Sequence, residues 1–471
     1  PAFSPDGATL AFLSTRSGTP QVWFLPVAGG EPEKKTDVPG GVGAFRFSPD
    51  GKRLFLVTDV WPECGADADC NRKRDEAMEK GKMKAVLADT LFVRRWDSWE
   101  DGKRTHVLRM DLADPKAPLV DLTPGDFDSP AFSVGGGADF DVSPDGKELA
   151  FTSSRDANPS FSTNVDVYVV PVDGTPEQLK APKNLTAKNP AFDGSPKYSP
   201  DGKSIAFRMQ RTPGYESDRF LLALYDRASG ASRVLTEAFD SWVGDYRFHP
   251  DGKRIFFLAD MKGRTPLFDL DLATGTVQVA TAVGHVDSFE IARDGTWAVL
   301  ARRQMHLPTE LWRVALAGKE PGTTTPLTFQ NQALVAEVDF RPMEEAYVDS
   351  PSGKKIQVLL VKPHGFDAAR KYPVIVNVHG GPQMQWADAY RPDAQVYPGA
   401  GYVVAFPNPH GSTGQGQDYT AAISGDWDGK VMKDVLAVAD WLSVQKWADA
   451  DRMGAMGWSW GGYAMMWLAG N

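Results

Sequence analysis

A four-residue turn motif recurs through the first two thirds of the chain and constrains its fold more than any other feature. The first copy reads Ser4-Pro-Asp-Gly7. Proline presets φ, aspartate caps the turn and glycine accepts a positive φ, so each copy predicts a tight hairpin. Most copies follow an aromatic or apolar strand and precede another. Further copies begin at Ser48, Ser143 and Ser199 and, in degenerate form, at His249 and Ala292.

Most neighbouring copies are 43 to 56 residues apart. That period fits four short strands and therefore indicates the blades of a β-propeller. The exception is the 95-residue span from Ser48 to Ser143, which can hold one blade with an insertion or two blades. We expect a seven-bladed propeller, with the blade beyond the six motifs either in this span or in an incomplete first blade that starts before Pro1. An open all-β sandwich is the alternative, but it does not explain the regular motif.

The pattern changes near residue 335, where strands begin to alternate with helices. Residues 429–442 form a predicted helix with one apolar face. Such alternation implies a mostly parallel sheet. We therefore expect a β-propeller over residues 1–335 and the first part of an α/β-hydrolase domain over residues 336–471. The predicted strands of that domain span 356–361, 374–378 and 402–406.

The sequence Gly457-Trp-Ser-Trp-Gly461 has the layout of a nucleophile elbow, with a short apolar strand before it and a helical stretch after it. The glycines allow a strained strand-to-helix turn without a Cβ clash. The turn exposes the Ser459 hydroxyl and directs the Trp460 N–H toward the place where an oxyanion would form. The alternative is a glycine turn in an unrelated α/β domain.

A second motif supports the elbow. The buried strand Tyr372–Val378 ends in His379-Gly-Gly-Pro382, the kind of glycine-rich loop that supplies the second oxyanion donor. Chain order argues against His379 as the catalytic base, because the triad of this fold runs Ser, then Asp or Glu, then His. We expect His379 to hold the loop through a ring hydrogen bond, and we assign no catalytic role to the other six histidines.

No Asp, Glu or His follows Ser459. We therefore expect a truncated enzyme whose triad Asp and His lie beyond Asn471, and whose isolated fragment is inactive.

Composition excludes several other classes of protein. The formal net charge is −10, and the absence of a basic cluster argues against nucleic-acid binding. No apolar run is long enough to span a bilayer.

The two cysteines, Cys64 and Cys70, predict a disulfide worth about 2 kcal/mol. A disulfide in turn predicts a periplasmic or secreted protein. The alternatives are two free thiols and a cytoplasmic protein; a metal pair would lack further ligands.

These motifs together resemble the prolyl oligopeptidase family of serine peptidases, in its acylaminoacyl-peptidase and dipeptidyl-peptidase-five branch. The resemblance implies short peptide substrates, no cofactor and the Gly381 N–H as second oxyanion donor. The family often has Arg where this chain has His410. The matching segments are His379-Gly-Gly-Pro382, Asn408-Pro-His-Gly-Ser412, Gly425-Asp-Trp427 and Gly457-Trp-Ser-Trp-Gly-Gly-Tyr463.

Two propeller segments, 92–99 and 213–219, also resemble dipeptidyl-peptidase-five sequences. A dipeptidyl peptidase needs a carboxylate to hold the free amine of its substrate. The candidates are Asp97 and Glu216, and the neighbouring aromatic residues Trp96 and Tyr215 are candidate substrate contacts. The alternative is that both carboxylates are structural and pair with nearby arginines.

The expected function is that of a serine exopeptidase that releases dipeptides from peptide N-termini through an acyl-enzyme on Ser459. An acylaminoacyl peptidase, which takes a neutral blocked N-terminus, is the alternative within the class. A propeller binding module without catalysis is the alternative from another class.

Overall fold

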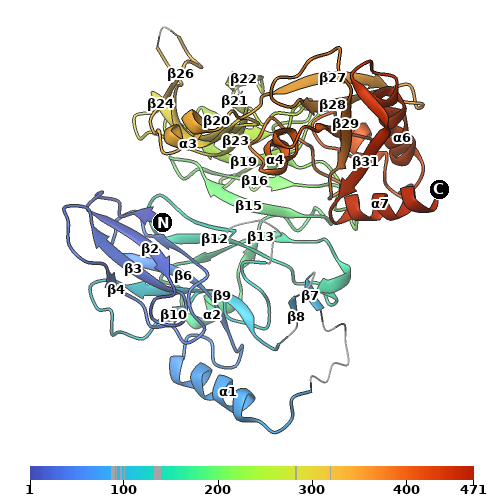
Figure 1. Cartoon of the computed structure of the whole chain (residues 1–471). Helices are drawn as coiled ribbons and strands as arrows, with labels where there is room; N and C mark the ends of the chain where they lie inside the picture. Colours follow the sequence, from blue (N-terminus) through green and yellow to red (C-terminus); the bar gives the residue numbers. More distant parts are fainter. Residues whose placement is uncertain are drawn as a thin grey trace. The chain divides into compact units, whose positions relative to one another are not determined.

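The computed structural model describes residues 1–471 except 86–90, 92, 96–97, 100, 132–138, 282–283 and 319, with backbone only at 93–95 and 98. The chain divides into two compact units (Figure 1). One comprises Pro1–Glu216 with Leu222–Val234, and the other comprises Ser217–Leu221 with Leu235–Asn471. Among the described residues, no helix combines the length and apolar character that crossing a bilayer requires.

The first unit carries four four-stranded sheets. All four join their strands in chain order, and the second, β5-β6-β9-β10, leaves out β7 and β8, which form a separate ribbon. Outside these sheets lie α1 (Ala68–Lys80), the short ribbon of β7 (Val93–Arg95) and β8 (Ser98–Trp99), the 3-10 turn η1 (Pro159–Phe161) and α2 (Pro176–Lys180). The sheet strands are β1 (Ala2–Phe3), β2 (Thr9–Ser14), β3 (Gln21–Pro26), β4 (Glu33–Lys34), β5 (Ala44–Phe47), β6 (Arg53–Val60), β9 (Arg104–Asp111), β10 (Val120–Asp121), β11 (Phe140–Val142), β12 (Glu148–Ser153), β13 (Asp166–Pro171), β14 (Lys183–Asn184), β15 (Asp193–Tyr198), β16 (Ser204–Met209), β17 (Leu221–Asp226) and β18 (Ser232–Val234).

The recurrent motif forms the turn between the first two strands of each sheet. In the second sheet, Ser48 Oγ donates to Asp50 Oδ1 at 2.6 Å, and Asp50 also accepts from the Lys52 amide at 3.1 Å. Gly51 adopts φ 71°. The two hydrogen bonds, chiefly the one from Ser48, hold the pKa of Asp50 below its ordinary value. The motif therefore fixes each hairpin through local contacts alone.

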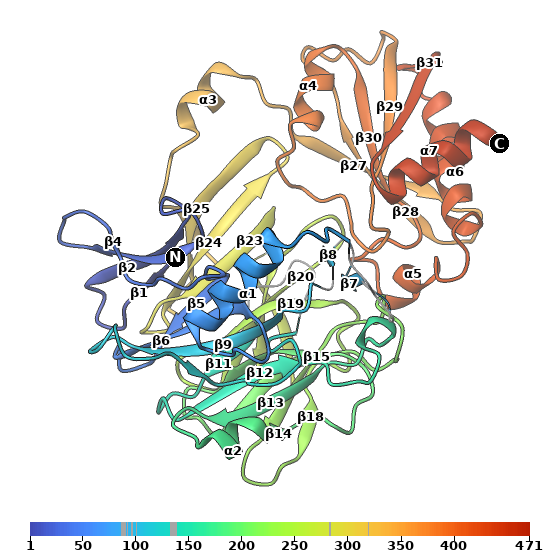
Figure 2. The same cartoon turned by 90° about the horizontal axis from the view of Figure 1, so that it is seen from below.

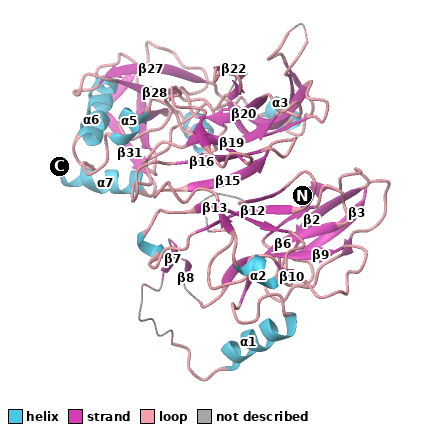
Figure 3. Ribbon diagram, turned by 180° about the vertical axis from the view of Figure 1, so that it is seen from behind, coloured by secondary structure: helices cyan, strands magenta, loops and turns pink. Residues whose placement is uncertain are grey.

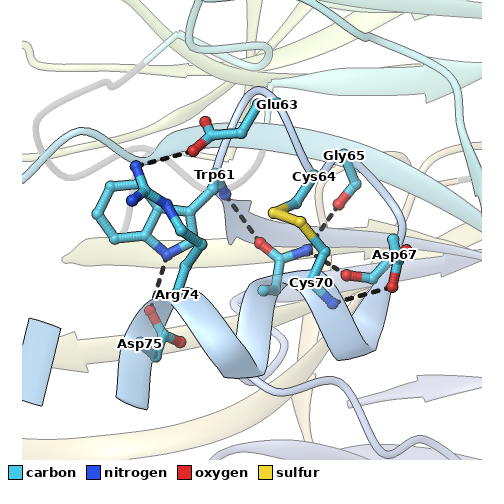
Figure 4. The surroundings of a disulfide bond; sticks show 9 residues. Trp61, Glu63, Cys64, Gly65, Asp67, Cys70, Arg74 and Asp75 are labelled. Atoms are coloured by element: carbon cyan, nitrogen blue, oxygen red, sulfur yellow. Dashed lines mark hydrogen bonds and ion pairs between the residues drawn. A yellow bond between two sulfur atoms is a disulfide. The ribbon is translucent and has the colours of Figure 1, made fainter. Parts of the chain in front are cut away.

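An insertion leaves the second sheet after β6 and explains the 95-residue span. Figure 4 shows the residues around its disulfide. It carries α1, which begins where Asp67 Oδ1 accepts from the Cys70 amide at 3.0 Å. A disulfide joins Cys64 to Cys70. The Trp61 indole donates to Asp75 Oδ1 at 2.9 Å and lies under the Arg74 guanidinium, 4.8 Å from the ring centre.

The predicted count of seven blades is wrong, because the described chain forms six four-stranded sheets. The span from Ser48 to Ser143 holds one blade and this insertion, not two blades. The charged helix α1 and its disulfide occupy the residues that a further blade would need.

The second unit contains the fifth and sixth sheets and then a five-stranded sheet (Figure 2). The helix α3 (Gln332–Glu337) follows the sixth sheet, and the predicted domain boundary after residue 335 falls within it. The division into compact units falls earlier, since the last two blades group with the α/β sheet. The blade strands are β19 (Val243–Phe248), β20 (Arg254–Ala259), β21 (Leu267–Asp271), β22 (Val277–Thr281), β23 (His285–Ile291), β24 (Trp297–Gln304), β25 (Leu307–Ala315) and β26 (Thr324–Pro326).

The five-stranded sheet has the order β27-β28-β30-β29-β31. Strand β29 runs parallel to β30 and β31, and β28 runs antiparallel to β27 and β30. This mixed sheet with its helices is the expected α/β-hydrolase part of the fold. Its elements are β27 (Met343–Asp349), β28 (Lys355–Val361), β29 (Tyr372–Val378), α4 (Asp393–Gly399), β30 (Val403–Asn408), α5 (Gln417–Ala421), α6 (Lys430–Ser443), β31 (Ala448–Gly457) and α7 (Trp460–Gly470).

Alternate residues of the central strands pack on opposite faces of this sheet. Val374 and Val376 of β29 join a core with Val435 of α6 and Ala464 of α7, the helices that lie beside the sheet in Figure 3. The other face packs Phe406 against Met305 of the sixth blade, in a cluster with Trp386 and Ala394. The sheet is thus buried on both faces, as parallel strands require.

The turn after β20 is fastened to the loop that follows β29. Gly263 donates its amide to Gln385 Oε1 at 2.8 Å and accepts at its carbonyl from the Asp388 amide at 2.7 Å. Lys262, which adopts φ 48°, donates its amide to Gly414 O at 3.0 Å. Blade five therefore supports the segment that carries the second oxyanion motif.

We expect the double replacement Cys64→Ser with Cys70→Ser to weaken α1 without unfolding the blade. The chain-entropy estimate for so small a loop is about 2 kcal/mol, or roughly 30-fold faster amide exchange. Hydrogen-exchange mass spectrometry over residues 68–80 would measure it, with β6 and β9 as internal controls. Unchanged exchange in α1 would show that the Trp61 contacts alone hold the insertion. Export of the protein stays a prediction.

Candidate active site

Ser459 stands at a sharp turn between β31 and α7. Its backbone has φ 58° and ψ −123°. Only Ser195, Lys262 and Ser459 combine a side chain with a positive φ among the described residues, and such a conformation is strained for any residue with a Cβ. Ser459 is exposed at the surface of the described chain. The turn thus presents a serine hydroxyl at the end of a strand, as a nucleophile elbow does.

Two glycines make this turn possible. A Cβ on Gly457 would lie 2.4 Å from Gly461 O, and a Cβ on Gly461 would lie 2.2 Å from Val378 O. Both distances are far below van der Waals contact, so any side chain would push α7 away from β29. Glycine at these two positions lets the helix begin directly against the end of the neighbouring strand.

The loop after β29 lies against the same serine. A Cβ built on Gly380 would come 2.7 Å from Trp458 O and 3.7 Å from Ser459 Oγ. Gly381 adopts φ 117°, which a residue with a side chain rarely does. The Trp460 amide belongs to the first turn of α7, where N–H groups have no partner within the helix. The structure thus brings Ser459, Gly380 and the start of α7 together.

His379 fixes the shape of this loop. Its side chain is buried, with 1% exposure, and Nδ1 lies 2.7 Å from Gly380 O. Since a carbonyl oxygen only accepts, the ring proton sits on Nδ1. Nε2 lies 2.8 Å from Ser412 Oγ. The contact holds the plane of the peptide that also carries the Gly381 N–H, because the C=O and N–H of one peptide point in opposite directions.

Burial keeps the His379 ring neutral. Loss of hydration lowers its pKa to about 4, only partly offset by the bond to Gly380 O. Its two ring nitrogens contact Gly380 and Ser412, not Ser459. The ring hydrogen bond expected from the sequence is present, and the geometry gives His379 a structural role.

Aromatic side chains to which the sequence analysis gave no packing role lie beside the elbow. Trp427 packs edge-on against Trp460 and Tyr463, with ring centres 6.5 and 5.6 Å apart. Trp427 and Trp458 are 49% and 87% exposed. The motif Gly425-Asp-Trp427 signalled the first of them, but its position beside α7 depends on a tertiary contact that no local pattern reveals.

The structure describes only two of the four candidate substrate residues. Asp97 and Trp96 lie outside the described residues. Glu216 is exposed, and its carbonyl accepts from Gln210 Nε2 at 3.0 Å. The Tyr215 hydroxyl is buried without a hydrogen-bond partner among the described residues. All four assignments stay predictions, as do those of Ser459, Trp460 and Gly381 to catalysis.

Comparison with known proteins agrees with this geometry. Residues 388–471 match the sequence model of the Prolyl oligopeptidase family. The chain is 31% identical to Dipeptidyl-peptidase 5 of Porphyromonas gingivalis and 32% identical to that of Porphyromonas endodontalis. Each match covers 100% of this chain and 67% of the relative, so the chain spans about two thirds of the length of these relatives.

Among solved structures, the fold is similar to that of Pyrococcus horikoshii acylaminoacyl peptidase, with a TM-score of 0.76 and 19% identity over 99% of this chain and 67% of that one. It is also similar to Porphyromonas gingivalis dipeptidyl peptidase 4, with a TM-score of 0.61 and 18% identity over 99% of this chain and 65% of that one. Together with the sequence relatives, these matches show that the chain belongs to the prolyl oligopeptidase family of serine peptidases.

Proposed function

We propose that the protein is a serine exopeptidase that releases dipeptides from peptide N-termini through an acyl-enzyme on Ser459. The observation that carries the proposal is the strained backbone of Ser459 at φ 58°, with Gly380 packed beside it. A propeller that only binds would have no need of this strain. The names of the sequence relatives, both Dipeptidyl-peptidase 5, favour dipeptide release over removal of acylated residues.

In the proposed reaction, Ser459 Oγ attacks the scissile carbonyl, and the proton passes to the histidine base of the triad. The N–H groups of Trp460 and Gly381 stabilise the oxyanion, each worth about 3 kcal/mol in comparable enzymes. His379 acts as a positioning residue, since its Nδ1–H holds the peptide that carries the Gly381 N–H. The C–N bond of the tetrahedral intermediate then breaks, and the shortened peptide leaves as an amine that takes the proton from the histidine. Water hydrolyses the acyl-enzyme and releases the dipeptide.

A carboxylate must read the substrate's free amine, because a buried ammonium without a counter-charge is unfavourable. We assign this role to Glu216, with Asp97 as the second candidate. The next residue, Ser217, accepts at its hydroxyl from Gln383 and at its carbonyl from Gln417 at 3.0 Å. Gln383 follows Gly381 by two positions, so the segment after Glu216 is fastened to the oxyanion loop.

The structural alternative for Glu216 is an ion pair with Arg94, Arg95 or Arg219, and the side chains of the first two lie outside the described residues. Arg219 instead donates to Phe239 O at 2.8 Å and lies 3.5 Å from Asp240. Within the described part of the chain, no ion pair joins Glu216 to Arg219. Pairing with Arg219 therefore does not occupy the Glu216 carboxylate.

In the intact enzyme, replacing Ser459 with alanine should reduce the hydrolysis of dipeptidyl amides on the order of 10⁴-fold or more, because the acyl-enzyme cannot form. Steady-state kinetics with a fluorogenic dipeptidyl amide would measure it. Ser424→Ala, at an exposed serine of the loop after α5, is the matched control and should retain activity. Equal activity of the two variants would refute the assignment of the nucleophile.

Replacing Glu216 with glutamine should lower kcat/KM for free-amine substrates by about 2–5 kcal/mol, the range for breaking a desolvated charge pair. Hydrolysis of the same peptide with an acetylated N-terminus should change far less. Asp97→Asn is tested in parallel. If neither variant discriminates between the free and the acetylated peptide, the amine is read elsewhere and the acylaminoacyl peptidase becomes the better assignment.

His379→Asn and His379→Gln separate the two ring contacts of His379. The asparagine amide can replace Nδ1–H against Gly380 O, whereas the glutamine amide reaches the place of Nε2. We expect kcat to fall on the order of 10²-fold in the glutamine variant and much less in the asparagine variant, with KM nearly unchanged in both, because the oxyanion forms only in the transition state. Equal losses would argue against the positioning role.

The two His379 variants should also differ from the wild type in how their stability depends on pH. The unfolded chain protonates His379 near its ordinary pKa of 6.5, whereas the folded chain keeps it neutral down to about 4. Protonation of the unfolded state therefore lowers the stability of the wild type, by about 3 kcal/mol, as the pH falls through this window. Urea unfolding between pH 4 and 6.5 should show that this loss is smaller in both variants.

A further inference from the structure

A second serine–histidine–aspartate arrangement lies away from Ser459, at the hairpin between β27 and β28. Ser352 Oγ is 3.2 Å from His410 Nε2, and His410 Nδ1 is 2.6 Å from Asp434 Oδ2. The serine comes from the hairpin turn, the histidine from the loop after β30 and the aspartate from α6. Three elements distant in the sequence therefore meet in the order that activates a serine hydroxyl.

The hydrogen bonds of Asp434 decide where the protons lie. One carboxylate oxygen accepts from Ser350 Oγ at 2.5 Å, and the other accepts from the His410 amide at 2.9 Å and from the ring Nδ1–H. In the neutral imidazole the one ring proton lies on Nδ1 toward Asp434, so Nε2 presents its lone pair. Ser352 Oγ lies 3.2 Å from this lone pair and 2.8 Å from Ser350 Oγ. Because Ser350 gives its own proton to Asp434, the Ser352 hydroxyl donates to Ser350 in this arrangement and rotates to give its proton to His410.

The three residues of this serine–histidine–aspartate array differ sharply in solvent exposure. Asp434 and His410 are 0% and 4% exposed, whereas Ser352 is exposed. The Tyr419 ring stacks on the imidazole at 4.3 Å and 22°, and its hydroxyl donates to Asn408 O at 2.9 Å. The His410 imidazole is therefore buried and held in place, whereas the Ser352 hydroxyl beside it is accessible to solvent and small reagents.

The groups that face His410 are thus Asp434 from α6, Ser350 and Ser352 from the hairpin, and Tyr419 from α5. Burial raises the pKa of the Tyr419 phenol well above its ordinary value, so this ring contributes stacking and no charge. The negative charge of Asp434 favours an imidazolium at His410 once Ser352 has given up its proton.

We propose that Ser352 is a second covalent acceptor site, which takes activated acyl and phosphonyl groups. In the acyl case, Ser352 Oγ attacks the carbonyl carbon of an aryl ester and gives its proton to His410 Nε2. The ester C–O bond breaks, the acyl group stays on Ser352, and the phenolate leaves and recovers the proton from the imidazolium or from water. No oxidant, reductant or metal takes part.

This site differs from Ser459 in what surrounds the reacting oxygen. The Ser352 amide already donates to Ser350 Oγ at 3.0 Å, and the Gly353 amide donates to Ser350 O at 2.9 Å. Neither N–H is available to an oxyanion. We therefore expect one equivalent of acyl group to accumulate on Ser352 without steady turnover.

Another serine in an exposed turn serves as a control for Ser352. Ser229, in the exposed turn between β17 and β18, donates its hydroxyl to Asp226 Oδ1 at 2.7 Å and has a carboxylate as its neighbour in place of an imidazole. It matches Ser352 in exposure and in turn setting. A difference in reactivity between the two serines therefore reports on His410.

The experiment uses the full chain with Ser459→Ala, so that the proposed nucleophile is removed. The protein is treated with p-nitrophenyl acetate and, separately, with a fluorophosphonate, and the modified peptides are identified by tandem mass spectrometry. We expect modification of Ser352 on the order of 10²-fold faster than of Ser229, the usual effect of a general base. Equal rates at the two serines would overturn the proposal.

Two further variants in that background test the base. His410→Arg can keep an ion pair with Asp434 but can only donate, so it should abolish modification of Ser352. Ser352→Ala should remove the rapid transfer of one equivalent of acyl group, and Ser229→Ala should leave that transfer unchanged. Modification of Ser352 that persists in a folded His410→Arg protein would also overturn the proposal.

A thiol readout does not depend on acyl chemistry or on the folding of a His410 variant. We expect the thiol of Ser352→Cys to ionise at lower pH than that of Ser229→Cys, because an imidazolium stabilises a thiolate. The pH dependence of alkylation by iodoacetamide measures both. Identical profiles would show that His410 does not accept a proton from position 352.

Discussion

The backbone of α7 begins so close to the end of β29 that only glycine fits between them. The Cα hydrogens of Gly461 face Val378 O at a distance where a methyl group would overlap it. The same crowding holds Gly457 against Gly461 and Gly380 against Trp458. Ser459 lies within this group of contacts and adopts φ 58°. The strain, about 1–3 kcal/mol for such a conformation, persists because Trp460 and Ala464 are buried in the core beneath the sheet.

The loop after β30 connects this elbow to the second serine site. Ser412 Oγ lies 2.8 Å from His379 Nε2 and 2.6 Å from Pro409 O, two acceptors that share its single proton. The next residue after Pro409 is His410, which binds Asp434. One short segment thus orients the oxyanion loop through Ser412 and presents a buried imidazole to the β27–β28 hairpin through His410. The two histidines differ in function because His379 is bonded to a neutral carbonyl and His410 to a carboxylate.

The hairpins and the elbow could be predicted from the sequence because their chemistry is local. Ser48 and Asp50 bond each other across two residues, and the glycines of the elbow adjoin Ser459. The number of blades could not be predicted, since length alone does not separate a blade from an insertion held by Trp61 and a disulfide. The Ser352 array was also missed: its members are 58 and 24 residues apart along the chain, and only the packing of α6 on the sheet brings them together.

Ser459 and Ser352 each have a different part of what a serine enzyme needs. In the proposed mechanism, backbone N–H groups beside Ser459 stabilise a developing oxyanion, whereas Ser352 has a histidine base held in place by Asp434. Oxyanion stabilisation lowers the barriers to forming and to breaking an acyl-enzyme alike, because both pass through a tetrahedral intermediate. A base alone assists the attack on a reagent that is already activated, but leaves a stable acyl ester behind. The identity of residue 410 decides whether Ser352 can form an acyl ester. An arginine at this position could also pair with Asp434, but it could not accept the proton of the Ser352 hydroxyl.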